Sequence, residues 1–197
     1  MSSSLPLPRV VADAFPRTLA VNAMLVVGAA ALIGLSAQLS VYLPGNPVPI
    51  TGQTFAVLIA AASVGLARGV SATILYALAG LAGVPWFAGA TSGLAVASFG
   101  YILGFVLAAA VVGALAERGW TRRPSLTVAA MVLGNLVIYS IGLPWLHSAT
   151  GLSWAETVGL GATPFLLGDV LKMALAAGLF SAAWAIINRR GSKGTQA

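Results

Sequence analysis

Two charged side chains stand inside a long apolar stretch of the chain. Asp169 and Lys172 belong to the segment Gly168-Asp-Val-Leu-Lys, within an apolar run from about residue 163 to 187. Residues three apart share one face of a helix, so the carboxylate and the ammonium group are expected to point the same way. An ionisable group at membrane depth costs roughly 2.5–3.5 kcal/mol to insert and commonly marks a functional site. We therefore interpret the pair as part of a substrate site, with a structural ion pair between helices as the alternative.

The composition is that of an integral membrane protein. Of 197 residues, 59% are hydrophobic and 7% are charged, whereas soluble domains carry about 25% charged residues. A membrane-spanning helix needs about 20 apolar residues, so the chain has room for six spans and for no sizeable soluble domain. The sequence contains no cysteine, which excludes disulfides, thiolate chemistry and cysteine-based metal sites.

The net charge of +6 raises the question of nucleic-acid binding. The cations, however, stand beside the apolar runs, as they do in the cytoplasmic flanks of membrane helices. All Lys and Arg residues except Lys172 fall in the two tails and in two predicted turns, which lie on one side of the membrane. The positive-inside rule then predicts that both termini are cytoplasmic. We expect membrane lipid, and no nucleic acid, around these charges.

The apolar runs predict an all-α membrane protein with six transmembrane helices. Its predicted parts are a cytoplasmic tail at 1–18, a six-helix transmembrane substrate-binding domain at 19–188 and a second cytoplasmic tail at 189–197. The spans are expected at about 18–39, 51–69, 70–82, 101–116, 125–143 and 163–187. The loops expected on the outside are 41–52, 83–100 and 144–162.

Two of the outer loops have distinctive sequences. Pro44, Pro47 and Pro49 forbid a helix in the first, which is expected to be extended. Residues 83–100 carry no charge, and irregular backbone this apolar must be buried in protein or line a cavity. Asp169 is expected about six residues into the last span, roughly 9 Å deep at 1.5 Å per residue. We therefore predict an outward-facing pocket with the 83–100 loop as an extracytoplasmic lid.

Several kinds of chemistry are excluded by residues that the sequence lacks. There is no phosphate-binding loop and no Gly-Lys pair, so the chain shows no energy source of its own. His147 is the only histidine, which excludes metal sites built on several histidines. Ser92 and His147 could be considered as a protease pair, but Gly89-Ala-Thr-Ser-Gly93 does not have the G-x-S-x-G spacing. We expect no enzyme activity, no metal and no cofactor.

Four segments of the chain, taken together and in this order, match the motifs of a known family. They are Asn46-Pro-Val-Pro-Ile-Thr-Gly-Gln-Thr-Phe55, Phe87-Ala-Gly-Ala-Thr-Ser-Gly93, Gly100-Tyr-Ile-Leu-Gly-Phe105 and Gly168-Asp-Val-Leu-Lys172. With this set the chain resembles the BioY family, the biotin-binding S components of energy-coupling-factor (ECF) transporters, from about residue 20 to 188. The first and last segments are specific when they occur together, whereas either one alone is a weak signal.

The resemblance implies a subunit of the bacterial cytoplasmic (inner) membrane that captures biotin from outside. A separate module, made of a transmembrane coupling subunit and two ABC-type ATPases, would supply the energy. This would account for the missing nucleotide motif. The alternatives are a solitary carrier and an S component for another small vitamin.

The candidate substrate-binding residues suit biotin, which has an apolar bicycle, a ureido group and a carboxylate tail. An ionised Asp169 can accept ureido N–H bonds, and Lys172 can donate to the ureido oxygen or to the carboxylate. Of these two poses we favour the ureido one, because it leaves the charged tail nearest to water. The other candidates are polar groups that would complete the hydrogen bonds and residues of the apolar lid loop: Thr51, Gln53, Asn135, Tyr139, Trp86, Phe87 and Gly93.

Overall fold

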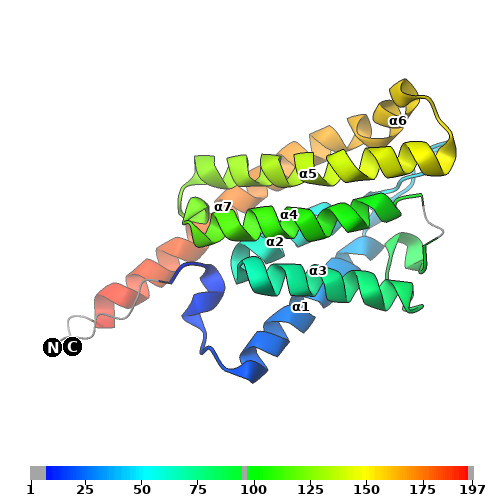
Figure 1. Cartoon of the computed structure of the whole chain (residues 1–197). Helices are drawn as coiled ribbons and strands as arrows, with labels where there is room; N and C mark the ends of the chain where they lie inside the picture. Colours follow the sequence, from blue (N-terminus) through cyan, green and yellow to red (C-terminus); the bar gives the residue numbers. More distant parts are fainter. Residues whose placement is uncertain (1–7, 95–96, 195–197) are drawn as a thin grey trace.

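The structure is a computed structural model that describes residues 8–94 and 97–194 (Figure 1). Residues 1–7 of the predicted tail, residues 95–96 of the predicted lid loop and residues 195–197 lie outside this described part. The helices are α1 (Leu19–Gln38), α2 (Gln53–Val64), α3 (Leu66–Leu81), α4 (Phe99–Glu117), α5 (Pro124–Thr150), α6 (Trp154–Gly161) and α7 (Leu166–Gly194). Short 3-10 turns occur at η1 (Val11–Ala14), η2 (Ala88–Ala90), η3 (Trp120–Arg122) and η4 (Thr163–Phe165).

Helix α4 lies at the centre of the bundle and contacts α2, α3 and α5 (Figure 1). Glycines make these contacts close. A Cβ atom on Gly104 would lie 3.0 Å from the backbone of Ile138 in α5, and one on Gly113 would lie 2.7 Å from the backbone of Leu66 in α3. Small residues of this kind let helix backbones approach one another in membrane proteins, where packing rather than the hydrophobic effect holds helices together.

Four stretches of the described chain are long and apolar enough to cross a membrane. They are Leu19–Gln38, Phe99–Glu117, Pro124–Thr150 and the stretch Trp154–Arg189. Helices α2 and α3 are apolar but shorter, with 12 and 16 residues. Large apolar side chains such as those of α1 are exposed on the outer faces, which suits contact with lipid. The protein is therefore a mostly helical, multi-pass membrane protein.

The prediction of a loop at 144–162 is wrong. Helix α5 continues through Pro144 to Thr150, and α6 occupies most of the remainder. Proline is tolerated in membrane helices because neighbouring groups satisfy the backbone that it leaves unpaired. A capping box starts α6: Ser153 Oγ accepts a hydrogen bond from Glu156 N (3.3 Å), and the Glu156 carboxylate accepts one from Ser153 N (2.9 Å). This Ser-x-x-Glu spacing is a helix-start signal that the sequence already contained.

The loop predicted at 41–52 is extended, as its prolines indicate. Its two ends pair as short antiparallel strands, β1 (Ser40–Val41) and β2 (Ile50–Thr51). Between the strands, Asn46 Nδ2 donates a hydrogen bond to the backbone oxygen of Leu160 in α6 (3.0 Å). The loop is thereby bonded to α6, and its last residues place Thr51 just before the start of α2.

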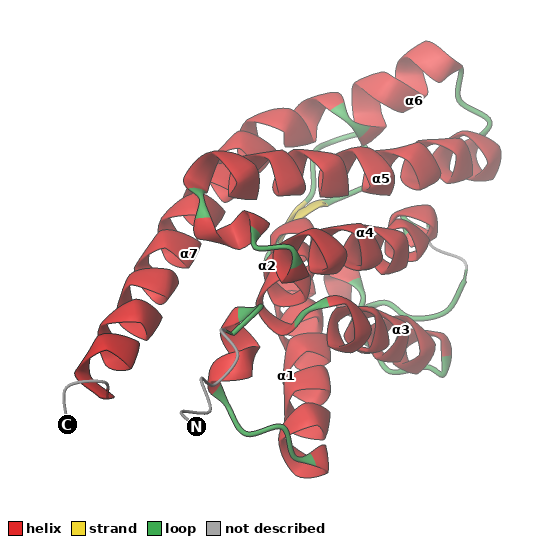
Figure 2. Cartoon of the chain, turned by 60° about the vertical axis from the view of Figure 1, so that its left-hand side comes forward, coloured by secondary structure: helices red, strands yellow, loops and turns green. Residues whose placement is uncertain are grey.

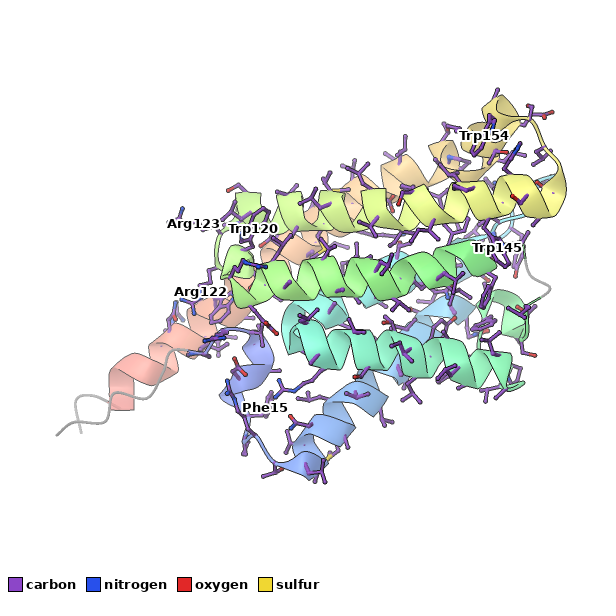
Figure 3. The ribbon with its side chains drawn as sticks, viewed as in Figure 1. Phe15, Trp120, Arg122, Arg123, Trp145 and Trp154 are labelled. Atoms are coloured by element: carbon purple, nitrogen blue, oxygen red, sulfur yellow. The ribbon has the colours of Figure 1, made fainter. Side chains whose placement is uncertain are left out.

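Charge separates the two ends of the molecule. Figure 3 shows Arg122 and Arg123 at one end of the helices, and Trp145 and Trp154 at the other. The first turn of α1 and the last turns of α7 lie toward the arginine end (Figures 1 and 2). We call this end, where the described arginines gather, the cationic end.

Asp13 fastens the N-terminal segment at the cationic end. Its carboxylate accepts hydrogen bonds from the N–H groups of Arg9 (2.9 Å) and Val10 (3.2 Å) and pairs with Arg17 (3.0 Å) and more distantly with Arg68 (3.9 Å). Burial by itself would raise the pKa of Asp13, but the N–H donors and Arg17 outweigh it and hold that pKa below its usual value. Residues 8–17 are therefore part of the packed structure.

We expect Gly113→Ala to destabilise the fold by roughly 1–3 kcal/mol, the usual cost of overpacking. The added methyl group would lie 2.7–2.9 Å from backbone atoms of Gly65 and Leu66, which cannot rotate away. The matched control is Gly28→Ala in α1, where nothing lies within 4 Å. It should be neutral or stabilising by up to about 1 kcal/mol. Thermal unfolding in detergent measures both changes, and equal unfolding temperatures for the two variants would contradict the close contact of α4 with α3.

Candidate functional site

The charged pair lies where α7 begins. Asp169 occupies the first turn of α7, where the positive end of the helix dipole favours a carboxylate. Only 2% of Asp169 is exposed. Tyr139 of α5 donates a hydrogen bond to Asp169 Oδ2 (2.5 Å), and Lys172 Nζ lies 3.5 Å from Asp169 Oδ1. The spacing of three residues thus places both charges on one face of the helix.

The ammonium group of Lys172 reaches across to the start of α2. It donates to the backbone oxygen of Thr51 (3.1 Å) and to Thr54 Oγ1 (2.8 Å). With Asp169 as the third partner, each of its three N–H groups has an acceptor. Because Tyr139 comes from α5, these bonds make a junction of α2, α5 and α7. We refer to Thr51, Thr54, Tyr139, Asp169 and Lys172 as the polar junction.

Gln53 adds a buried amide next to the polar junction. Only 5% of this residue is exposed, and its Nε2 donates to Tyr76 Oη of α3 (2.6 Å). Its Oε1 accepts a hydrogen bond from Thr51 Oγ1 (3.1 Å), which in turn accepts one from Gln53 N (3.2 Å). Buried polar side chains are held in one orientation by such bonds. The first turn of α2 is therefore fixed from α3 on one side and from α7 on the other.

A cavity with about 450 Å³ of empty space, part of it open to solvent, lies beside the polar junction. Small-molecule sites combine apolar walls with a few polar groups that fix the orientation of the ligand. Here α2 supplies the polar wall, and aromatic side chains of α4, α5 and η4 supply much of the rest. The lining residues are Val48, Pro49, Thr51, Gln53, Thr54, Ala88, Ser98, Tyr101, Ile102, Phe105, Tyr139 and Phe165. We call this space the main cavity.

A second, smaller cavity, with about 190 Å³ of empty space that includes open solvent, also borders Thr54. Asn135 and Lys172 line it together with apolar residues of α2, α5 and α7. Asn135 is 7% exposed, and within residues 8–94 and 97–194 its side chain has no hydrogen-bond partner. Asn135 and Tyr139, four residues apart in α5, therefore line neighbouring cavities.

The three candidate residues of the predicted lid loop, Trp86, Phe87 and Gly93, pack against the bundle. Phe87 is 1% exposed and packs into the core. Trp86 Nε1 and Gly93 N each donate a hydrogen bond to a backbone oxygen of α3, both at 3.0 Å. None of the three is among the residues that line the main cavity, whereas Ala88 and Ser98 of the same loop are. The aromatic pair thus anchors the loop against the bundle, and small residues of the loop face the cavity.

Several residues that line the main cavity were not among the predicted candidates, and Thr54, Tyr101 and Phe105 are the most informative of them. Thr54 is the closest partner of Lys172 and stands in the same segment as Thr51. Tyr101 Oη donates to the backbone oxygen of Gly161 (2.8 Å), which joins α4 to α6. Tyr101 and Phe105 belong to the Gly100–Phe105 segment, so the motif itself was the signal that could have found them.

His147 has a structural place in the described fold. Its Nδ1 lies 2.7 Å from the backbone oxygen of Leu152, and its ring stacks on Trp154 with centroids 4.3 Å apart. Within the described ranges, no three His, Cys, Asp or Glu side chains come together in a group that could hold a metal ion.

The chain is similar to proteins of one family along most of its length. The family model described as "BioY family" matches residues 9–189. A biotin transporter, BioY2, of Lactococcus lactis subsp. cremoris is 36% identical over 149 residues, which are 74% of this chain and 80% of that protein. The biotin transporter BioY of Rhizobium etli is 32% identical over 159 residues, 76% of this chain and 84% of that protein.

A solved structure shares the fold. It is a crystal structure of the S-component for biotin from an ECF-type ABC transporter, and it aligns with a TM-score of 0.74 at 18% sequence identity. The alignment covers 85% of this chain and 93% of the other. At this identity the likeness describes the arrangement of the helices, and the side-chain geometry above is a property of this chain.

We expect Tyr139→Phe to lower the free energy of unfolding by roughly 1.5–3 kcal/mol, because it removes a hydrogen bond to a charged group that is buried. The phenylalanine fills the same volume, so the loss reports the bond to Asp169 and not a cavity. Tyr42→Phe is the control, since Tyr42 is 57% exposed and surface changes usually stay within about 0.5 kcal/mol. Unfolding in detergent with increasing denaturant measures both, and an equal effect of the two changes would refute the role of the bond.

Proposed function

The chain belongs to the BioY family, and on that premise we propose that it is a biotin-capture and uptake subunit, the S component of an ECF-type transporter. The observation that carries this proposal is the buried polar junction beside a cavity lined by aromatic and apolar side chains. A substrate with an apolar bicycle and several hydrogen-bonding groups matches these two surfaces. The protein would bind and release biotin without changing it chemically, so it is not an enzyme and needs no cofactor.

The ureido group of biotin is the part that suits the polar junction. Asp169 and Lys172 are not among the residues that line the main cavity, so the polar junction would open toward the cavity when biotin binds. A carboxylate offers about four lone-pair sites, so Asp169 would then accept from a ureido N–H in addition to Tyr139 and Lys172. Lys172 would exchange its bond to Thr51 or Thr54 for one to the ureido oxygen. The apolar bicycle would then lie among the aromatic side chains of the main cavity, with the valerate tail directed to water.

The other candidate residues would act at different distances from the ligand. Thr51, Gln53 and Tyr139 line the main cavity and would contact biotin directly. Asn135 lies behind Lys172 and would help to orient the ammonium group from the second cavity. Trp86, Phe87 and Gly93 would support the lid loop from behind rather than cover the bicycle themselves.

The loop at 83–100 would close the main cavity from outside. Gln38 Nε2 donates to the backbone oxygens of Trp86 (3.1 Å) and Phe87 (3.2 Å), so the start of this loop is held by a side chain at the end of α1. Ala88 would then close directly over the ligand. Hydrogen-exchange protection of this loop should rise with biotin, and unchanged protection at saturating biotin would argue against the lid.

The proposed orientation follows from the cationic end. We assign that end, with both termini, to the cytoplasm of a bacterium and assign the main cavity to the outer side of the inner membrane. Helices α1 to α5 and α7 would be the six spans, and α6 would lie at the outer surface. Because the chain has no cysteine, single cysteines at positions 45 or 151 can be labelled selectively. Labelling only from the cytoplasmic side would contradict this orientation.

A separate module would supply the energy for uptake. The sequence has no phosphate-binding loop, so ATP hydrolysis would come from two ABC-type ATPases acting through a transmembrane coupling subunit. The alternative is a carrier that works alone. Uptake of labelled biotin by cells that contain this chain without a coupling module would favour the alternative.

A panel of vitamins tests the substrate. Biotin at about a hundred times its dissociation constant should stabilise the purified protein by about 2.7 kcal/mol. Other small vitamins at the same concentration should shift the thermal unfolding temperature much less. A larger shift in unfolding temperature with another vitamin would mean that this vitamin, and not biotin, is the substrate. No shift with any of the vitamins would contradict a binding role.

The double variant Asp169→Asn with Lys172→Met separates binding from folding. Asp169→Asn alone should weaken biotin binding by several kcal/mol and destabilise the fold, since a buried charge left without its partner costs about 3–5 kcal/mol. Removing both charges should restore folding and membrane insertion but not biotin binding. Calorimetric titration with biotin measures this difference, and near-normal affinity in the double variant would mean that the pair is structural only.

A further inference from the structure

The cationic end holds a group of arginines that the proposed uptake function does not use. Arg9, Arg118, Arg122 and Arg123 line one cavity with about 750 Å³ of empty space. The only acidic residue in its lining is Glu117, whose carboxylate already accepts a hydrogen bond from Leu66 N (2.8 Å). We call this space the arginine cavity.

Two of these arginines are held in place by the fold. Arg122 Nη2 donates to the backbone oxygen of Pro8 (2.6 Å), and its guanidinium group lies 4.7 Å from the ring centroid of Trp184. Trp184 is itself fixed, because its Nε1 donates to Thr121 Oγ1 (3.1 Å). Arg118 Nη1 donates to the backbone oxygen of Ala114 (3.1 Å). Part of the positive charge is therefore preorganised by η3, α4 and α7.

The charges of the other two arginines are available to bind an anion. Within residues 8–94 and 97–194, the guanidinium groups of Arg9 and Arg123 have no hydrogen-bond or ion-pair partner, and both residues are exposed. Guanidinium groups bind phosphate through paired N–H donors. Four of them around one cavity, with one engaged carboxylate, make a site for a phosphate group.

An apolar cleft adjoins the arginine cavity. It has about 1,280 Å³ of empty space, including its opening, and Arg9 and Glu117 line both spaces. Its apolar wall comes from both sides of the gap between α1 and the α2–α3 turn, with Leu19, Ala23 and Val26 on the α1 side. Charged residues line it too, namely Asp13 and its ion-pair partners Arg17 and Arg68. A soluble phosphate has no part that would use such a wall, whereas a phospholipid has acyl chains that would.

We propose that the arginine cavity and the adjoining cleft together bind one anionic phospholipid, with its phosphate among the arginines and an acyl chain along α1. The site lies at the end of the apolar helices, where a lipid headgroup is already present at the membrane surface. Basic pockets between membrane helices commonly bind acidic headgroups there. The lipid would bridge η1, α1 and the α4–α5 turn, and so hold the N-terminal segment against the bundle.

Native mass spectrometry of the detergent-purified protein tests the site. The probes are phosphatidylglycerol and phosphatidylcholine with identical acyl chains, and the readout is the ratio of lipid-bound to lipid-free protein. We expect several-fold more phosphatidylglycerol than phosphatidylcholine on the protein. Equal retention of the two lipids, or retention of neither, would overturn the proposal.

Charge variants locate the binding. Arg123→Gln should lower phosphatidylglycerol retention about fivefold, the effect of losing one cation near an acidic headgroup. Arg9→Gln with Arg123→Gln should lower it about 25-fold if the two contacts are independent. Arg189→Gln is the matched control, because it removes one charge near the end of α7 and Arg189 lines neither space. Equal losses for Arg123→Gln and Arg189→Gln would mean diffuse attraction without a site.

Two further arms distinguish a lipid from a free anion. Glycerol phosphate in large excess should leave phosphatidylglycerol in place, and displacement by this soluble headgroup alone would overturn the lipid assignment. Ala23→Trp narrows the apolar cleft without changing charge, so it should lower retention as well. Unchanged lipid retention in that variant would contradict the placement of the acyl chain in the cleft. Each variant is first checked for a single symmetrical elution peak, so that a folding defect is recognised before lipid binding is measured.

Discussion

The need to partner one buried carboxylate shapes the half of the molecule that contains the polar junction. Asp169 is 2% exposed, and an ionised carboxylate in such surroundings is costly unless charges and hydrogen bonds compensate it. Its compensation comes from Tyr139 of α5 and from Lys172 one turn along α7. Lys172 in turn needs acceptors, and it finds them at the start of α2. Three helices are thus held at fixed distances by the requirements of one ion pair.

The same requirement explains why an extended hairpin precedes α2. The acceptor that Thr51 offers to Lys172 is a backbone oxygen, and it is free because Thr51 stands at the end of β2, just before the helix. The prolines that forbid a helix in residues 44–49 therefore serve the site directly, because they keep this backbone extended. Gly52 and Gln53 then turn the chain into α2, and Gln53 is locked by Tyr76. The main cavity is the space left between this turn and the aromatic residues of α4 and α5.

The sequence was informative wherever one residue type in a given place has few physical explanations. An Asp-x-x-Lys pair in an apolar run has few physical explanations, and so does a short run with three prolines. The charged pair, the extended loop and the bounds of α1 could therefore be predicted. It was uninformative where partners are far apart in the chain. Lys172 and Thr54 are 118 residues apart, and only the packing of α7 on α2 brings them together. The orientation of Phe87 likewise depends on Gly80, where a Cβ would collide with its ring.

The polar groups of the site are hydrogen-bonded to one another, and this bears on selectivity. The carboxylate has Tyr139, the ammonium group has three acceptors, and Gln53 has Tyr76 and Thr51, so a ligand gains little unless it replaces bonds that it breaks. A ligand that breaks these bonds but brings no N–H donors of its own would leave buried groups unpaired, and each such group costs about 1–3 kcal/mol. A site built on hydrogen bonds rejects analogues that lack them far better than an apolar pocket rejects an analogue of slightly different size. Asn135 is the exception, since its amide lacks a partner in the described chain. In the proposed binding mode it would offer the junction a further polar group when Lys172 turns toward the ligand.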